Sequence, residues 1–328
     1  MVEDARAFWL LEPGRGEIRS APLPPPGAGD VRVRTLWSGI SRGTESLVFQ
    51  GRIPEREYET MAAPFQEGAL PGPVKYGYLN VGTVEHGPTD LIGSTVFCLY
   101  PHQTHYVVPS SAVVPVPSEV PAERAVLAGT VETAVNGLWD AGPLIGDRIA
   151  VVGAGMVGCC AAHLLGQIPG VKVTLVDTDS DRANVASALG VDFALPDDAP
   201  EGNDLVVHAS TSSAGLSRSL ELLGPEGTVV DMSWYGDEQV TLPLGQAFHS
   251  SRLTIRASQV GAVAPARRTR RTHRDRLTLA LDLLADPAYD ALLTGRSSFD
   301  QLPETMAAIA AGSLEGLCHT ISYEGMEV

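Results

Sequence analysis

The stretch that decides the fold runs Arg148-Ile-Ala-Val-Val-Gly153-Ala-Gly155-Met-Val-Gly158. A short apolar run leads directly into G-x-G-x-x-G, and small residues with helical character follow it. Gly153 permits a tight turn, Gly155 lets a pyrophosphate approach the backbone, and Gly158 lets the helix pack closely on the strand. The helix N-terminus directs free N–H groups and partial positive charge at such phosphates. The stretch therefore predicts the strand, turn and helix of a dinucleotide-binding site.

Asp177 closes the next apolar run, Val171–Val176, about 20 residues after the glycines. A carboxylate there accepts hydrogen bonds from the adenosine ribose hydroxyls and repels a 2′-phosphate, so NAD is expected rather than NADP. Later strands of a parallel sheet end at the same edge, where ligands bind. The residues expected to contact the cofactor are Gly153, Gly155, Met156, Val157, Gly158, Asp177, Thr178, His208, Ala209, Ser210, Ser233 and Trp234.

The composition excludes several classes of protein. The 328 residues, of which 44% are hydrophobic, suffice for about two domains. A net charge of −16 argues against a general nucleic-acid binder, which needs a basic surface. The four cysteines show neither zinc-ribbon spacing nor a disulfide framework, which fits a reducing compartment. Because Met1–Leu10 lacks a basic start followed by a long apolar run, we expect a cytoplasmic protein with no membrane partner.

The chain changes character near residue 119. Before it, period-two runs such as Val31–Trp37 alternate with Gly and Pro, which predicts a barrel of short strands. After it, strand and helix patterns alternate as far as Leu253–Ser258, which predicts a parallel sheet with helices on both faces. The expected fold class is α/β, with a barrel catalytic domain at 1–122, a doubly wound dinucleotide-binding domain at 123–262 and a return to the catalytic domain at 263–328.

Several motifs resemble those of the medium-chain dehydrogenase/reductase superfamily, which includes the zinc-type alcohol dehydrogenases, over nearly the whole chain. They are Ser38–Glu45 (S-G-I-S-R-G-T-E), Tyr76–Gly82, Ile92–Val96, His105–Pro109, Gly153–Gly158 and Leu292–Leu302. The resemblance implies a GroES-like β-barrel catalytic domain, a Rossmann domain and nicotinamide-dependent oxidoreductase activity. The first motif is locally similar to a zinc-lacking subgroup that includes bacteriochlorophyllide-type dehydrogenases.

The departures from the superfamily pattern concern its zinc ligands. The ligand cysteine of S-G-I-C-G-T-D falls at Ser41 and Arg42, and the ligand histidine of G-H-E falls at Tyr78. The third ligand falls near Ala128 and Gly129, and the four-cysteine lobe of the family is missing. A zinc site needs three or four N, S or O ligands that converge on the ion. We therefore expect no zinc and no other metal.

Without zinc, a side chain must polarise the substrate oxygen and supply a proton, while the nicotinamide carries the hydride. The resemblance places Thr44 at the hydroxyl that relays the proton, and Tyr78 at the position of the ligand histidine. Glu132 lies on the helix that enters the Rossmann half, where a buried carboxyl would have a raised pKa and act as an acid. Each has a structural alternative: a turn cap for Thr44, a packed aromatic ring for Tyr78 and helix N-terminal stabilisation for Glu132.

Weaker candidates for substrate contact are Glu45, Lys75, Tyr100 and His102. His102 and His105 have metal-like spacing, but no cysteine or carboxylate lies close in sequence to join them, which favours a place in the cleft or core. Arg267–Arg276 carries six arginines in an acidic chain. These arginines either form a solvated segment paired with surface carboxylates, or capture an anionic substrate or a partner subunit.

The leading interpretation is a zinc-independent, NAD(H)-dependent oxidoreductase that interconverts an alcohol and a ketone, with a small-molecule substrate that is either large or anionic. An alternative is an NADPH-dependent quinone or enoyl reductase that reduces a C=C bond. An alternative of another class is a dinucleotide-binding protein without catalysis. The strand pattern Leu253–Ser258 is expected at a sheet edge, where pairing across a two-fold axis would give a homodimer.

Overall fold

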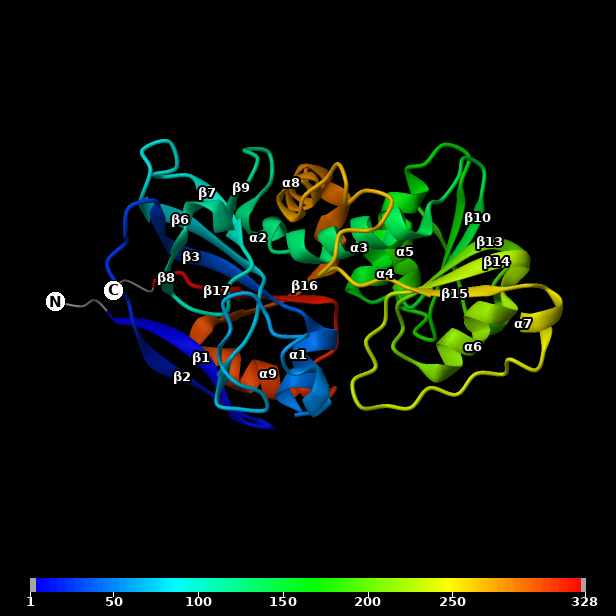
Figure 1. Cartoon of the computed structure of the whole chain (residues 1–328), viewed down its shortest axis with the longest axis horizontal. Helices are drawn as coiled ribbons and strands as arrows, with labels where there is room; N and C mark the ends of the chain where they lie inside the picture. Colours follow the sequence, from blue (N-terminus) through cyan, green and yellow to red (C-terminus); the bar gives the residue numbers. More distant parts are fainter. Residues whose placement is uncertain (1–3, 326–328) are drawn as a thin grey trace. The chain divides into compact units, whose positions relative to one another are not determined.

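The computed structural model describes residues 4–325 (Figure 1). Residues 1–3, which belong to the segment expected to lack a leader, and residues 326–328 lie outside the described residues. The contacts divide the described chain into two compact units: unit 1 holds residues 4–129, 281–285 and 293–325, and unit 2 holds residues 130–280 and 286–292. The domain limits expected after residues 122 and 262 stay predictions. Among the described helices, none has the length and apolar character needed to cross a bilayer.

Unit 1 is built on two sheets of mainly antiparallel strands. The smaller sheet has the order β2-β1-β5-β4 and the larger the order β16-β17-β3-β6-β7-β9, with β8 paired to β3. The strands are β1 (Asp4–Glu12), β2 (Arg15–Pro22), β3 (Asp30–Ile40), β4 (Glu67–Gly68), β5 (Val74–Lys75), β6 (Asn80–His86), β7 (Thr95–Cys98), β8 (His105–Pro109), β9 (Val113–Pro115), β16 (Leu293–Ser298) and β17 (Cys318–Ser322).

Period-two patterns bury one face of these strands, as the sequence predicts. In β3, Val31 and Val33 are fully buried, while Arg32 and Arg34 between and after them remain partly exposed. The buried valines pack in one apolar cluster with residues of β6, β7, β8 and β9. The apolar face of each strand therefore builds the core of unit 1.

Unit 1 contains helices that the sequence did not predict. The half before residue 119 was expected to hold only strands and loops, but Arg42–Phe49 forms helix α1 and packs beside α9 (Leu302–Ala310). Leu47, Val48 and Phe49 form its buried face. The sequence does not predict this helix, because its eight residues are too few to show a clear 3.6-residue period of apolar positions. The short α2 (Ala122–Ala125) completes this unit.

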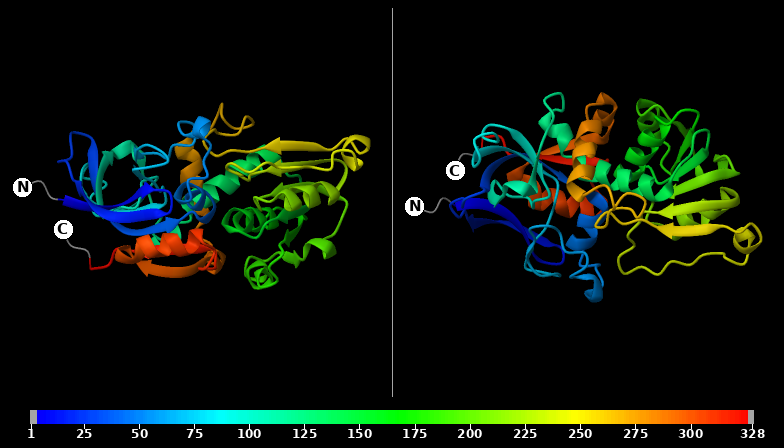
Figure 2. Two further views of the ribbon diagram at one scale, coloured as in Figure 1. Left: turned by 90° about the horizontal axis from the view of Figure 1, so that it is seen from below. Right: turned by 45° about the horizontal axis from the view of Figure 1, so that its top comes forward.

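Unit 2 contains a six-stranded parallel sheet with the order β12-β11-β10-β13-β14-β15. The first strand of the unit is central, and the chain winds outward from it first in one direction and then in the other. Because the chain winds in opposite directions from the central strand, its helices cover both faces of the sheet, which is the doubly wound arrangement (Figure 2). The strands are β10 (Arg148–Val152), β11 (Lys172–Val176), β12 (Asp192–Ala194), β13 (Asn203–His208), β14 (Leu223–Asp231) and β15 (Thr254–Ala257).

The helices of unit 2 follow the expected alternation closely. The expected strand at Arg148–Val152 is present as β10, and the helix after the glycine loop is present as α4. Between the strands, helices alternate as the sequence predicts, and the short α7 is an addition that the sequence did not predict. The helices are α3 (Ala128–Ala141), α4 (Met156–Gly166), α5 (Arg182–Ala188), α6 (Ser213–Glu221), α7 (Ala247–Ser250) and α8 (His273–Leu283). The first residues of α3 and the last residues of α8 are assigned to unit 1.

Candidate functional site

The three glycines of the loop between β10 and α4 differ in the space that surrounds each Cα. Gly153 has φ +107°, and a Cβ there would lie 2.7 Å from the Cα of Ser210. At Gly158 a Cβ would lie 1.8 Å from the carbonyl oxygen of Gly153. At Gly155, the N-cap of α4, a Cβ would meet nothing within 4 Å. Two glycines are therefore required by the fold itself, whereas the third leaves open space beside a helix N-terminus, as a bound phosphate needs.

Asp177 lies immediately after β11 and contacts the glycine loop. Its Oδ2 accepts a hydrogen bond from the Ala154 backbone N–H at 2.6 Å, and its Oδ1 accepts one from Asp179 N–H at 3.0 Å. The next basic side chain after Asp177 in the sequence, Arg182, is paired with Asp179 at 3.1 Å. A fixed carboxylate thus stands at the end of the second strand, which favours ribose hydroxyls and disfavours a 2′-phosphate. Thr178 beside it is exposed.

His208, Ser210 and Ser233, which the sequence placed at one edge of the sheet, lie at or just after the ends of β13 and β14 and contact one another there. His208 is fully buried; its Nδ1 lies 2.9 Å from Asp231 Oδ1 and its Nε2 lies 2.7 Å from Ser210 Oγ. Ser233 Oγ lies 3.2 Å from the same Nδ1, and Tyr235 donates to Asp231 Oδ2 at 3.1 Å. Although burial alone would raise the pKa of Asp231, its hydrogen bonds from His208, Ser233 and Tyr235 lower that pKa below its ordinary value. The carboxylate therefore stays ionised. Ala209 and Trp234 are half-buried.

In unit 1, Thr44 and Tyr78 belong to one cluster of hydroxyl groups. Tyr78 donates to Ser41 Oγ at 2.7 Å, and the side chains of Ser41 and Thr44 both act to lower the pKa of Tyr78. Burial raises the pKa of Tyr78 to about 12, and the negative charge of Glu45 adds to the shift. The phenol therefore keeps its proton at neutral pH. Helix α1 supplies Thr44, while Ser41 precedes α1 and Tyr78 precedes β6, so tertiary packing assembles the cluster.

Glu45 and His102 form a buried pair behind this cluster. Their side chains are 4% and 1% exposed, and His102 Nε2 lies 3.0 Å from Glu45 Oε2. Glu45 Oε1 accepts a hydrogen bond from the Ser41 backbone N–H at 2.8 Å, which holds the start of α1. His102 Nδ1 lies 2.7 Å from Ser38 Oγ. Both groups thus face the protein interior, and Glu45 has the basic partner that the sequence could not identify.

Lys75 and Tyr100 lie in a second polar cluster of unit 1. Lys75 Nζ donates to Gln103 Oε1 at 2.6 Å, contacts Tyr100 OH at 3.4 Å and pairs with Glu67. Burial lowers the pKa of Lys75, although the pairing with Glu67 opposes the shift. These contacts use the donors of the ammonium group within the chain, so they fix loop positions around β5.

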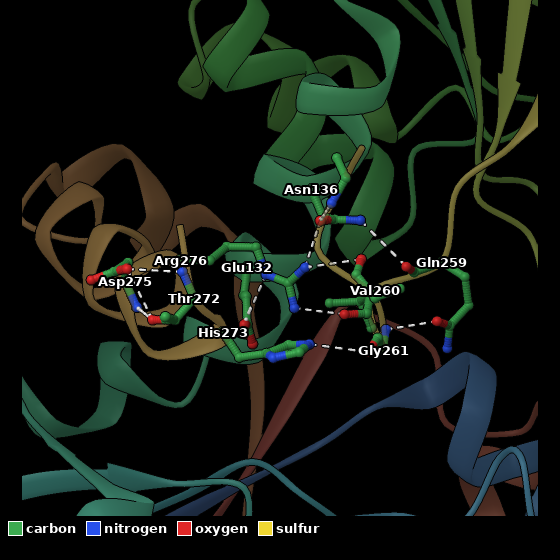
Figure 3. A network of polar contacts seen from close by, with 11 residues as sticks. Glu132, Asn136, Gln259, Val260, Gly261, Thr272, His273, Asp275 and Arg276 are labelled. Atoms are coloured by element: carbon green, nitrogen blue, oxygen red, sulfur yellow. Dashed lines mark hydrogen bonds and ion pairs between the residues drawn. The ribbon is translucent and has the colours of Figure 1, made fainter. Parts of the chain in front are cut away.

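Glu132 takes part in a buried network inside unit 2 (Figure 3). Its Oε1 accepts a hydrogen bond from Arg276 Nε at 3.0 Å, and the two side chains are 5% and 2% exposed. Arg276 also binds the Asn136 side chain and the carbonyl oxygens of Val260 and Ala262. Burial raises the pKa of Glu132, and the guanidinium opposes the shift. Arg276 therefore differs from the rest of its basic run, in which Arg267, Arg268, Arg270, Arg271 and Arg274 are exposed.

The donor set does not fit zinc. Among residues 4–325, no group of three or more His, Cys, Asp or Glu side chains is placed to hold a metal ion. The positions that the superfamily resemblance assigns to ligands carry the hydroxyls of Ser41 and Tyr78, and the backbone of Gly129 packs against Leu79. Neutral hydroxyls and a glycine lack the thiolate, imidazole or carboxylate donors that zinc requires. The four cysteines are free thiols and buried.

Several residues of these clusters were not singled out by the sequence. Asp231 ends an apolar strand at the ligand-binding edge, so its position alone was a usable signal. Ser38 and Tyr323, whose hydroxyls lie 3.0 Å apart, are separated by 285 residues along the chain. No local pattern reveals such a contact.

Comparison with known proteins supports the fold. No family model matches the chain. An alcohol dehydrogenase of Cupriavidus necator H16 is 22% identical over 296 residues, covering 74% of this chain and 80% of the relative. The short chain alcohol dehydrogenase rspB of Escherichia coli CFT073, complexed with NADH, superposes with a TM-score of 0.77 at 16% identity, covering 98% of this chain and 99% of that structure.

A second solved structure leads to the same conclusion. A candidate zinc-binding dehydrogenase of Sinorhizobium meliloti 1021, bound to NADP, has a TM-score of 0.77 at 17% identity and covers 98% of this chain and 99% of its own. These three proteins are named as dehydrogenases, and the two solved structures hold NADH and NADP respectively. The chain has the fold of the medium-chain dehydrogenases/reductases, a GroES-like unit followed by a Rossmann unit.

Proposed function

We propose that this protein is a zinc-independent, NAD(H)-dependent oxidoreductase that interconverts an alcohol and a ketone. The observation that carries the proposal is the hydroxyl cluster of Ser41, Thr44 and Tyr78, in which Tyr78 donates to Ser41 Oγ at 2.7 Å. Ser41 and Tyr78 fall at positions where the resembled zinc enzymes have metal ligands, and Thr44 falls at the hydroxyl that relays the proton. The cluster therefore offers a proton donor where zinc would act as a Lewis acid. The names of similar dehydrogenases support the class of reaction.

A bound nicotinamide would supply the hydride that the carbonyl carbon receives in ketone reduction. The carbonyl oxygen accepts a hydrogen bond from the Tyr78 phenol and takes its proton as negative charge develops on that oxygen. Ser41 and Thr44 then stabilise the phenolate through their hydroxyl groups until it regains a proton from water. Alcohol oxidation runs through the same groups in reverse. Glu45, paired with His102, keeps the phenol protonated by its negative charge.

The preference for NAD rests on Asp177. A 2′-phosphate placed a few ångströms from a fixed carboxylate is disfavoured by roughly 1–4 kcal/mol. A fluorescence titration with NADH and, separately, with NADPH tests this, and we expect NADH to bind at least about 10-fold more tightly. Tighter NADPH binding would favour the quinone or enoyl reductase. If the protein bound neither nucleotide, both the alcohol–ketone oxidoreductase and the quinone or enoyl reductase would be excluded.

Turnover with a panel of ketones and alcohols tests the catalytic half of the proposal. Tyr78→Phe removes the proton donor and keeps the ring, so we expect kcat to fall by about 100-fold or more with NADH affinity unchanged. Tyr289→Phe is the matched control, since it also deletes one buried phenol hydroxyl, in unit 2. Equal activity of the two variants would remove Tyr78 from the reaction. Zinc analysis of active protein should find far less than one ion per chain, and a chelator should leave turnover unchanged.

A further inference from the structure

Three side chains at the edge of the unit 2 sheet have the mutual geometry of a serine–histidine–aspartate triad. Ser210 Oγ lies 2.7 Å from His208 Nε2, and His208 Nδ1 lies 2.9 Å from Asp231 Oδ1. They come from the end of β13, the turn after it and the end of β14. The sequence predicts that His208 and Ser210 contact the cofactor, but the hydride-transfer proposal gives this hydrogen-bonded arrangement no chemical step.

The hydrogen-bond partners determine which ring nitrogen carries the hydrogen in the neutral imidazole. Asp231 is an acceptor only, so the nitrogen that faces it, Nδ1, carries the hydrogen. In the neutral ring Nε2 is then an acceptor, and the Ser210 hydroxyl donates to it. The Tyr235 hydroxyl and the Ser233 N–H also donate to Asp231, and these hydrogen bonds hold its carboxylate in place. Ser210 thus faces the imidazole of His208, whose orientation is fixed by the hydrogen bond between its other ring nitrogen and Asp231.

The surrounding backbone leaves room for this serine. A Cβ at Gly215 would lie 2.1 Å from Ser210 Oγ, so only glycine is compatible with the observed hydroxyl position. Thr211, the next residue, has φ +52°, a conformation that costs a non-glycine residue of order 1 kcal/mol. Its N–H donates to Ser233 Oγ at 3.1 Å, which ties the strained turn to the end of β14. The His208 side chain is fully buried, whereas Ser210 is partly exposed.

We propose that Ser210 is an activated nucleophile that accepts acyl groups from small esters, with His208 as its general base and Asp231 as the residue that positions His208. Ser210 Oγ attacks the ester carbonyl while its proton passes to His208 Nε2. The C–O bond to the alcohol breaks, and the departing alkoxide takes that proton. Water then attacks the acyl-serine, giving its proton to His208 and releasing the carboxylic acid and the free serine.

The closing experiment is covalent labelling of the whole protein with a fluorophosphonate, followed by peptide mapping. Ser210, Ser212 and Ser213 lie in the same peptide, so the neighbouring serines are internal controls in the native protein. We expect the adduct on Ser210 at least about 100-fold more often than on either neighbour. Absence of an adduct on Ser210, or equal adducts on all three serines, would overturn the proposal. This comparison requires neither a variant nor a cofactor.

Variants and a chromogenic ester test the roles of the partners. The native protein should release nitrophenolate from p-nitrophenyl acetate, and Ser210→Ala should abolish release while Ser213→Ala leaves it unchanged. His208→Gln and Asp231→Asn should slow both labelling and release by about 100-fold. Circular dichroism checks that each variant is folded. Unchanged labelling in a folded H208Q protein would contradict activation of the serine. An Asp231→Asn pH profile identical to the native one would remove Asp231 from its positioning role.

Discussion

At the scale of single residues, one loop shows how the fold and a ligand make separate demands on the same residue type. Gly153 and Gly158 have no space for a Cβ because backbone atoms of the protein occupy it. Gly155 has that space and leaves it empty. The sequence motif treats the three glycines alike, so only the environment of each distinguishes a requirement of the fold from a requirement of the ligand.

This distinction predicts opposite outcomes for two alanine substitutions. Gly158→Ala forces a Cβ against the Gly153 carbonyl and should lower the free energy of unfolding by about 1–3 kcal/mol, even though alanine favours helices. Gly155→Ala should leave stability within about 0.5 kcal/mol of the native value and weaken NADH binding by about 10-fold or more. Urea unfolding and NADH titration measure both quantities. Unchanged NADH affinity in G155A would place the phosphates elsewhere.

The pKa of Tyr78 gives a prediction of pH dependence. An exposed tyrosine loses its proton near pH 10, whereas burial and Glu45 raise the pKa of Tyr78 to about 12. The raised value means that the proton-donating form is fully populated below pH 10 and is lost only as pH rises further. We therefore expect kcat/KM for ketone reduction to show no loss from Tyr78 between pH 7 and about pH 10.5. A decline with an apparent pKa near 9 that Y78F abolishes would contradict this assignment.

At the scale of elements, one guanidinium joins three segments of unit 2. Arg276, in the first part of α8, binds Glu132 and Asn136 on α3 and the carbonyl oxygens of Val260 and Ala262 in the loop after β15 (Figure 3). Asn136 in turn accepts a hydrogen bond from the Ala264 backbone N–H at 3.0 Å. These backbone N–H and C=O groups of the loop after β15 thus find their hydrogen-bond partners in side chains rather than in a neighbouring strand.

Removing one partner of this buried pair should be strongly destabilising. Arg276→Met leaves the Glu132 carboxylate buried without its cation, and we expect a loss of about 3–5 kcal/mol in unfolding free energy. The double substitution E132L/R276M removes both charges and should recover much of that loss. Arg268→Met, at an exposed arginine of the same run, serves as the control and should change stability by less than about 0.5 kcal/mol. Equal losses in R276M and R268M would contradict the network.

At the scale of the whole molecule, the charge is strongly negative but unevenly distributed. The net charge is −16, yet Arg267, Arg268, Arg270 and Arg271 are all exposed within one short segment. Acidic net charge keeps copies apart in solution, so association of chains requires a specific surface. Strand β15 offers one, because in the described part of the chain it pairs on one side only, with β14.

We expect the protein to be a homodimer that pairs through β15 across a two-fold axis. Light scattering should then give twice the chain mass of 34.6 kDa. Thr254→Lys places a charge on the exposed side of this edge strand and should shift the protein towards monomer. Thr241→Lys adds the same charge to an exposed loop residue and should leave the dimer intact. A native monomer at micromolar concentration would refute the expected assembly.

The sequence by itself determined the Rossmann unit. Apolar runs of fixed period, the glycine spacing and Asp177 specify β10, α4 and β11, because the forces that form these elements act between residues close in sequence. Tertiary structure alone decided three other clusters: Tyr78 with Ser41, Glu45 with His102, and Glu132 with Arg276. Their members lie up to 144 residues apart along the chain. Hydrogen bonds between such groups depend on where strands and helices end in space, and no local pattern of residues encodes that position.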